Sequence, residues 1–237
     1  MNILGFIPFV LYLFGSAWRP LIYAGFLVQS IYLSMRGVEL GRLPLVGVHD
    51  TLSFLSASII GFSLPLHRAL SRKRSFYTSL GIMAVVFTAL SMGFKPHSTP
   101  LPPVLKTYWF ELHVAMSFFS YAAFGISAIL GGLYLREQDL LLERLQYKYI
   151  FIGYSLFSAS MIFGGIWAFL AWGTYWLWTP KELWTTILWL FYSFYLHARL
   201  RQGWAGKPSS VLGIVGFFIV LFTYLGVGLL MKSSHAF

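Results

Sequence analysis

The sequence contains no cysteine, and only 7 of its 237 residues are acidic. Without cysteine the chain can form no disulfide and can supply no thiol, so any thiol in its chemistry must belong to a partner. Charged residues make up 10% of the chain and hydrophobic residues 58%, and the mean hydropathy is +0.72. A water-soluble domain of this size needs a far more charged surface. The composition therefore predicts an all-α, polytopic integral membrane protein.

The net charge of +10 could indicate a nucleic-acid partner, but the cations lie in short loops between apolar runs. Contact with anionic lipid headgroups accounts for that placement better, so we expect a bilayer and no nucleic acid. The chain has no internal repeat and no low-complexity segment, and we treat residues 1–237 as a single membrane domain.

Eight runs lack Asp, Glu, Lys and Arg, and they predict a bundle of seven or eight transmembrane helices. The first two are shorter than the roughly 20 residues that cross a bilayer. They form either two short helices with a tight turn at residues 18–20, which we favour, or an interfacial helix and one span. The runs cover residues 1–16, 20–35, 51–66, 75–94, 112–135, 150–171, 183–198 and 211–231.

Orientation follows from the Lys and Arg residues in the short loops, because cations collect on the cytoplasmic side. Alternating spans place 11 of the 17 cations on one face, namely Arg19, Arg68, Arg72, Lys73, Arg74, Arg136, Arg144, Lys148, Arg199, Arg201 and Lys207. We therefore expect this face to be cytoplasmic, and the C-terminus and the loop before residue 183 to be non-cytoplasmic.

That loop is the most distinctive stretch of the chain: Trp172-Gly173-Thr174-Tyr175-Trp176-Leu177-Trp178-Thr179-Pro180-Lys181-Glu182-Leu183-Trp184. We call residues 172–184 the tryptophan loop. Gly173 and Pro180 predict a break between two helices. Six of the nine tryptophans fall between Trp167 and Trp189. Such density fits either an interfacial aromatic belt or a platform for a large, flat, apolar ligand, with a charged end at Lys181 and Glu182.

Two histidines favour the platform. His113 starts one span and His235 follows the last, so both fall at the predicted membrane depth of the tryptophan loop. Neutral imidazoles on either side of an aromatic surface are what a bis-histidine iron porphyrin requires. A zinc site is less well supported, because the chain has no cysteine and few carboxylates on the outer side. His197, near the cytoplasmic end of its span, is either a functional group or a side chain that reaches the interface.

The remaining ionisable groups are assigned no chemistry. His49 and Asp50 are expected to cap a helix start, and His67 and His97 to be solvated. The charged residues Arg136, Glu137, Asp139, Glu143 and Arg144 are expected to form a solvated connector helix with pairs at helical spacing. Glu182 complements the dipole of the helix that follows it, or else orients a ligand.

The tryptophan loop resembles the tryptophan-rich (WWD-type) signature of the haem-handling proteins of cytochrome c assembly. Further stretches resemble the CcsA/ResC family, the membrane half of the system II cytochrome c synthase, and the resemblance covers about residues 44–237. These stretches are Tyr195-Leu196-His197-Ala198-Arg199, Gly203-Trp204-Ala205-Gly206, Phe222-Thr223-Tyr224-Leu225-Gly226-Val227, Trp109 with His113-Val114, and Ser120-Tyr121-Ala122, with a looser match at Pro44 to Ser53.

The resemblance implies that His113 and His235 are axial ligands of haem b on the outer face. It implies that His197 belongs to a second haem position, whose other ligand comes from a CcsB/ResB-type partner. With that partner, the family attaches haem vinyl groups to the CxxCH cysteines of apocytochrome c, as a haem lyase of the cytoplasmic or thylakoid membrane. The haem contacts are expected from the tryptophan loop, through Trp172, Tyr175, Trp176, Trp178, Lys181 and Trp184, with no acid–base catalyst.

One departure keeps an alternative open, because the family usually has Asp where this chain has Thr179. The chain is also short at its N-terminal side. A divergent, HemX-like haem-binding subunit without synthase activity is the second interpretation. A transporter of small ions ranks last, because its usual relay of intramembrane carboxylates is missing.

Overall fold

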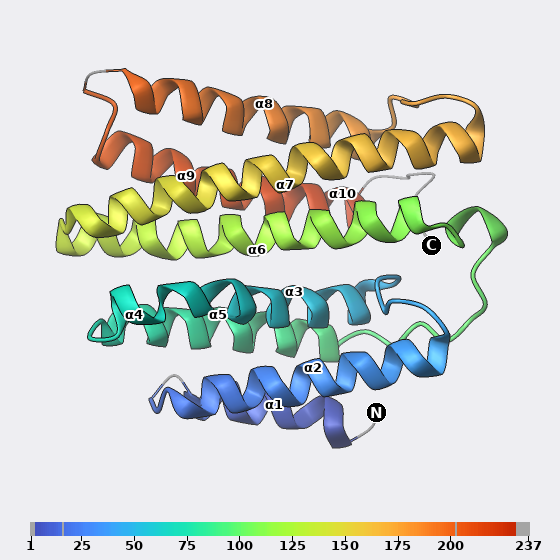
Figure 1. Ribbon diagram of the computed structural model, residues 1–237, viewed down its shortest axis with the longest axis horizontal. Coiled ribbons are helices and arrows are strands. Elements are labelled where there is room, and N and C mark those ends of the chain that lie inside the picture. The colour runs from blue at the N-terminus through green and yellow to red at the C-terminus, as the bar shows by residue number, and fades with distance from the viewer. Residues whose placement is uncertain (1–2, 16, 202, 231–237) are drawn as a thin grey trace. The chain divides into compact units, whose positions relative to one another are not determined.

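The computed structural model describes residues 3–15, 17–201 and 203–230, and every regular element in that part of the chain is a helix (Figure 1). The all-α prediction is therefore confirmed. The chain divides into two compact units, residues 1–100 and 101–237, and the boundary falls in the proline-rich loop that follows α5. Each unit is described by itself.

Unit 1 contains paired antiparallel helices. Helix α1 lies against α2, and α3 against α5 (Figure 1). The predicted tight turn before Pro20 is confirmed, because α1 ends at Gly15 and α2 begins at Pro20, where proline is well placed in a first helical turn. The helices of this unit are α1 (Ile3–Gly15), α2 (Pro20–Leu40), α3 (Val48–Ser63), α4 (His67–Leu70) and α5 (Arg74–Met92).

Helix α2 continues five residues beyond the predicted end at residue 35, because its charged side chains find partners there. Arg36 donates to the buried carboxylate of Asp50 over 2.9 Å. The capping role expected for His49 and Asp50 is wrong: α3 begins at Val48 without a side-chain cap. The ring of His49 instead lies between the Tyr32 hydroxyl and the Ser91 carbonyl, at 3.0 and 2.8 Å.

Unit 2 is built from α6 (Tyr108–Glu137), α7 (Leu140–Trp172), α8 (Pro180–Leu200) and α9 (Lys207–Leu221), which continues through a π-helical turn (Phe222–Gly226) into α10 (Val227–Leu230). Helix α6 lies against α7 and α9, and α8 also contacts both of these helices. In Figure 1 the α7–α8 connection and the start of α6 lie at one end of this unit, and the α6–α7 and α8–α9 connections at the other.

The predicted connector helix belongs to a longer element, since residues 140–172 form one helix of 33 residues. Its solvation is confirmed for Arg136, Glu137 and Arg144, which are exposed, and is wrong for Glu143. Asp139 caps the start of α7 by accepting from the Leu141 N–H at 2.9 Å. Glu143 is buried and accepts two hydrogen bonds from the Arg199 guanidinium, at 2.6 and 3.0 Å. This bidentate pair joins the start of α7 to the end of α8.

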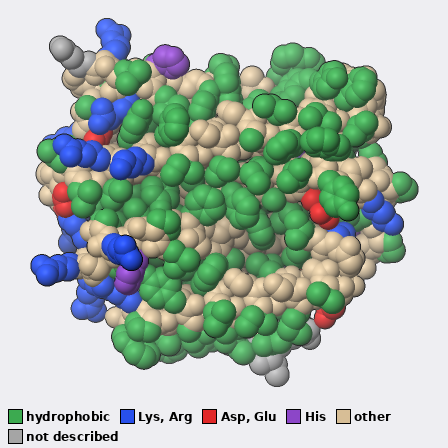
Figure 2. All heavy atoms as spheres, viewed as in Figure 1, with side chains coloured by type: hydrophobic (Ala, Val, Ile, Leu, Met, Phe, Trp, Pro, Cys, Tyr) green, Lys and Arg blue, Asp and Glu red, His purple; other side chains and the backbone are tan. Residues whose placement is uncertain are grey.

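Among the residues that the structure describes, five segments are long and apolar enough to cross a membrane, by length and composition: α2, α5, α6, α7 and Lys207–Gly226. The chain is an integral membrane protein, and the additional spans expected at α1, α3 and α8 stay predictions. In unit 2, hydrophobic side chains cover the visible sides of the helices, and Lys and Arg gather toward the end with the α6–α7 and α8–α9 connections (Figure 2).

Candidate functional site

The tryptophan loop leaves α7 and enters α8 as the sequence predicts. Helix α7 ends at Trp172, and Gly173 follows with a φ of 74°, a left-handed conformation that glycine adopts without strain. Helix α8 begins at Pro180, whose missing N–H is no loss in a first turn. Residues 173–179 are therefore irregular backbone between two apolar helices.

Glu182 holds this irregular backbone in place. Its Oε2 accepts the N–H groups of Leu177 and Thr179, both at 2.9 Å, and the Thr179 hydroxyl accepts from the Glu182 N–H at 3.4 Å. This reciprocal arrangement is a capping box. The first-turn position expected for Glu182 is thus confirmed, and its carboxylate fixes loop geometry through two backbone donors.

Thr179 is the N-cap residue of α8. Threonine and aspartate both serve as N-caps, because each offers a side-chain oxygen to an unsatisfied backbone N–H. Thr179, in place of the Asp usual in the resembled family, therefore keeps the cap and removes one negative charge.

Several aromatic rings of the loop are exposed. Tyr175 is 60% and Trp178 66% exposed, and Trp172 is 36% exposed. Trp178 has a φ of 58°, which is uncommon for a bulky residue and marks locally constrained backbone. The loop therefore presents aromatic surface to its surroundings. Trp176 is half-buried and adds to this surface.

Other rings fix the platform to the helices beneath it. Tyr175 stacks on Phe169 with centroids 4.6 Å apart, and Trp172 meets Trp167 edge-on at 4.9 Å. Trp184 packs against Phe222, the first residue of the π-helical turn, at 4.5 Å. Contacts to α7 and to the C-terminal helix thus hold the tryptophan loop from two sides.

His113 lies in the second turn of α6 and faces α7. Its Nδ1 lies 2.8 Å from the Ser160 carbonyl, which can only accept, so Nδ1 carries the proton. In the neutral ring this leaves Nε2 with a free lone pair. The imidazole stacks on Trp167 with an interplanar angle of 18°. Such fixing of one ring nitrogen by a backbone carbonyl is typical of metal-ligating histidines.

Two residues complete the surroundings of His113. A Cβ on Gly164 would lie 2.6 Å from the His113 Nδ1, so α7 needs glycine at this point. Lys181 lies in the first turn of α8, which begins at the same end of unit 2 as the start of α6 that carries His113 (Figure 1). His113 and Lys181 therefore both belong to the tryptophan loop end of unit 2.

Of the other two predicted iron ligands, the structure describes only His197. His235 lies outside the described residues. His197 lies in the last turns of α8, about 24 Å along the helix from Lys181, so it belongs to a separate position. It is exposed, and its Nδ1 donates to the Ser193 carbonyl at 2.7 Å, which again leaves Nε2 available. Within the described part of the chain, no three His, Asp or Glu side chains converge on one point.

The two histidines expected to be solvated have nearby partners. His67 is exposed but its Nδ1 lies 2.9 Å from the Tyr23 hydroxyl, and His97 is partly exposed beside the Thr99 hydroxyl at 3.0 Å.

Sequence reasoning missed Ser160, Gly164 and Trp167, the three α7 residues against which His113 lies. They are 47 to 54 positions away in the chain, and no local pattern links them to His113. Only the adjacent glycines at 164 and 165 gave a signal, because glycine within a helix costs stability and often has a packing reason.

Comparison with known proteins decides the family. The family model described as "Cytochrome C assembly protein" matches residues 45–235. The "Cytochrome c biogenesis protein CcsA" of Mesostigma viride is 30% identical, over 96% of this chain and 87% of that protein. The CcsA proteins of Prochlorococcus marinus and Heterosigma akashiwo are 28% and 32% identical, over 94% and 89% of this chain and 84% and 81% of theirs.

The chain belongs to the CcsA family of cytochrome c assembly proteins. The family model begins where the resemblance at Pro44 to Ser53 was noted. The alignment with the Mesostigma relative covers nearly the whole chain, so the likeness of this CcsA-family chain also takes in residues upstream of residue 44.

Proposed function

We propose that this chain binds haem b at the tryptophan loop, with His113 as an axial ligand of the iron. The observation that carries the proposal is the hydrogen bond from His113 Nδ1 to the Ser160 carbonyl. This hydrogen bond fixes the imidazole and leaves Nε2 available to a metal. His113 lies at the same end of unit 2 as the exposed indoles (Figure 1). These residues suit an iron porphyrin, because one imidazole and a broad aromatic surface occur together.

Trp172, Tyr175, Trp176, Trp178 and Trp184 provide the flat apolar surface of this proposed site. Lys181 supplies a cation for a propionate, and no carboxylate needs to take part because Glu182 is occupied by two backbone donors. Haem, when bound, supplies the vinyl groups that accept thiols. The contribution of this chain is to hold and orient the ring and to limit its freedom.

His235 is the proposed second axial ligand. Tyr224 packs against Phe118 and Tyr121 of α6, with centroids 5.0 and 6.3 Å apart. From there the chain continues through α10 toward the end of α6 that carries His113. Four residues separate Leu230 from His235, and the five steps from one Cα to the next reach at most about 17 Å. This course supports a ligand that approaches from the C-terminal side.

His197 is proposed to mark a second haem position toward the other end of α8. Because its ring is exposed and Nδ1 is engaged by Ser193, Nε2 is free to meet a ligand shared with another chain. We propose a CcsB/ResB-type membrane protein as that partner. Together they would present haem to the CxxCH cysteines of apocytochrome c on the non-cytoplasmic side, where each thiol adds across a vinyl group to form a thioether.

The absorption spectrum of the purified full chain tests the ligand assignment. We expect a six-coordinate, low-spin haem spectrum in the unaltered protein, which weakens in His113→Ala and His235→Ala and is lost when both are changed. His67→Ala and His97→Ala are the controls and should leave the spectrum unchanged. A bis-histidine spectrum that survives the double substitution would refute the assignment.

The alternative is a HemX-like subunit that binds haem without attaching it. Thr179 was the residue that favoured this alternative, and its capping role weakens that argument, because the loop keeps the hydrogen bonds an N-cap Asp would make. Reconstitution with a CcsB-type partner and a CxxCH substrate separates the two functions. Thioether-linked haem supports the synthase role, and bound haem without any covalent product supports the alternative.

A further inference from the structure

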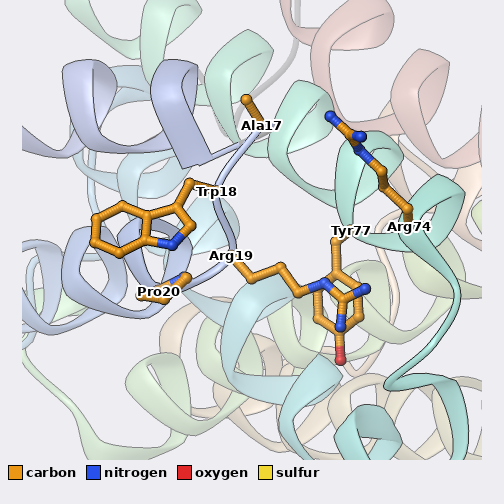
Figure 3. A pocket seen from close by; sticks show the side chains of 6 residues that line it. All are labelled: Ala17, Trp18, Arg19, Pro20, Arg74 and Tyr77. Carbon is orange, nitrogen blue, oxygen red and sulfur yellow. The ribbon is translucent and has the colours of Figure 1, made fainter.

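Unit 1 contains a pocket of about 390 Å³ between the α1–α2 turn and the first turn of α5 (Figure 3). It is lined by Ala17, Trp18, Arg19, Pro20, Arg74 and Tyr77. Figure 3 shows the two arginines entering from opposite sides, with the Arg19 guanidinium lying over the Tyr77 ring. The carbon at the centre of that guanidinium is 4.4 Å from the ring centroid.

The charge around this pocket is of one sign. Residues 1–100 contain only two carboxylates, Glu39 and Asp50. Glu39 is 20 residues from Arg19 along α2, about 30 Å away, and Asp50 is paired with Arg36 at that far end. Arg19 donates to the Ser71 carbonyl and lies over the Tyr77 ring, and neither of these partners carries a negative charge that would neutralise the guanidinium.

Two helix N-termini add to this positive field. Helices α2 and α5 both begin at the pocket, and neither has an acidic residue in its first turn or a side-chain cap. The amino ends of helices carry partial positive charge and readily accept anions. At α2 the N–H groups of Leu21 and Ile22 already bond to the Trp18 and Arg19 carbonyls, so this helix start contributes partial positive charge and no free donor. Two guanidinium groups and the positive ends of two helices therefore surround one space whose lining contains no carboxylate.

The surface beside the pocket is apolar and suits a ligand with hydrocarbon chains. Phe14 and Trp18, one helical turn apart in sequence, are 60% and 61% exposed, and Leu13 is 48% exposed. In a chain that spans a membrane, an exposed indole next to arginines is typical of the headgroup level. A small free anion would leave this apolar strip unused.

We propose that this pocket binds the phosphate of an anionic phospholipid, with the acyl chains lying along the exposed face of α1. Arg19 and Arg74 hold the phosphodiester oxygens through charge-assisted hydrogen bonds. The site differs from a general attraction to the membrane surface because it depends on these two arginines and not on the other cations of the same connection.

The test measures lipid retention by native mass spectrometry and thermal stability of the full chain in detergent. Phosphatidylglycerol, phosphatidylcholine and inorganic phosphate are titrated separately. We expect phosphatidylglycerol to bind and stabilise, and Arg19→Gln/Arg74→Gln to bind it at least about tenfold more weakly. Arg68→Gln/Arg72→Gln, which removes two exposed cations from the same connection outside the pocket, should bind as the unaltered protein does.

Arg74→Gln alone is included because Arg74 is exposed and its loss should not disturb folding. It should weaken phosphatidylglycerol binding severalfold. Equal losses in the two double variants would overturn the proposal in favour of unspecific surface charge. Equal stabilisation by inorganic phosphate or by phosphatidylcholine would overturn it in favour of a site that does not select an anionic lipid. The haem spectrum should stay unchanged throughout, so this outcome is independent of the proposed function.

Discussion

At the residue scale, the placement of His113 depends on what is absent from α7 at Gly164. A methyl group there would lie 2.6 Å from Nδ1 and would displace the imidazole from the Ser160 carbonyl. The neighbouring Gly165 is a matched control, since the nearest atom to a Cβ at that position is 3.7 Å away. Alanine at either position changes the helix propensity of α7 by the same amount, but only alanine at position 164 disturbs the His113 imidazole. Comparing the two variants therefore separates the effect on the ligand from the effect on the helix.

We expect Gly164→Ala to lower haem occupancy and to alter the low-spin spectrum, because the displaced imidazole no longer directs its Nε2 at the haem iron. Gly165→Ala should keep the spectrum and gain a little helix stability, at most about 1 kcal/mol. Both variants are compared by haem-to-protein ratio and by circular dichroism. Identical haem spectra in the two variants would contradict the proposed role of His113.

The capping box gives a second prediction at this scale. Glu182→Ala leaves the N–H groups of Leu177 and Thr179 without their acceptor, at a cost of about 1–3 kcal/mol. We expect faster hydrogen exchange in residues 174–179 and weaker haem binding. Thr179→Asp should keep the exchange rates of the unaltered chain, because aspartate is an equally good N-cap. Faster exchange in Thr179→Asp would show that the hydroxyl has another role.

At the scale of elements, the break at residues 173–179 and most helices were predictable, because apolar runs, Gly173 and Pro180 are local signals. The merger of residues 140–172 into one helix was not, although nothing in that stretch forces a break. The burial of Glu143 could not be predicted, because its partner Arg199 is 56 positions away in the sequence. Likewise the contacts of His113 with Ser160 and Gly164 depend on how α6 packs against α7. The pattern of apolar residues in the sequence does not specify which residues of two helices come into contact.

The Glu143–Arg199 pair predicts a measurable coupling between α7 and α8. Glu143 also lies within 3.5 Å of the Gly206 nitrogen and the Ser209 hydroxyl oxygen, so this carboxylate of α7 contacts both α8 and the start of α9. We expect Glu143→Gln and Arg199→Gln each to destabilise the fold. The double variant should lose less than the sum of the two, with a coupling of about 1–3 kcal/mol. Additive losses in a denaturant-unfolding cycle would contradict this.

For the whole molecule, the placement of the cations predicts which end of unit 2 faces the cytoplasm, and the absence of cysteine makes this prediction directly testable. In unit 2 the tryptophan loop lies at one end and the α6–α7 connection at the other (Figure 1). Cation-rich connections stay cytoplasmic, since moving Lys and Arg across a bilayer is costly. The loop that presents Tyr175 and Trp178 should then meet apocytochrome c outside.

We expect a membrane-impermeant maleimide to label Tyr175→Cys in intact cells, and Arg144→Cys only after the membrane is opened. Both positions are exposed and outside the proposed iron ligands, and no native cysteine competes for the reagent. Ser234→Cys should label as Tyr175→Cys does, because His235 must share the compartment of the tryptophan loop to bind the same iron. Labelling of residue 234 only in opened cells would separate His235 from His113 by the full bilayer, and one haem could not then be held by both.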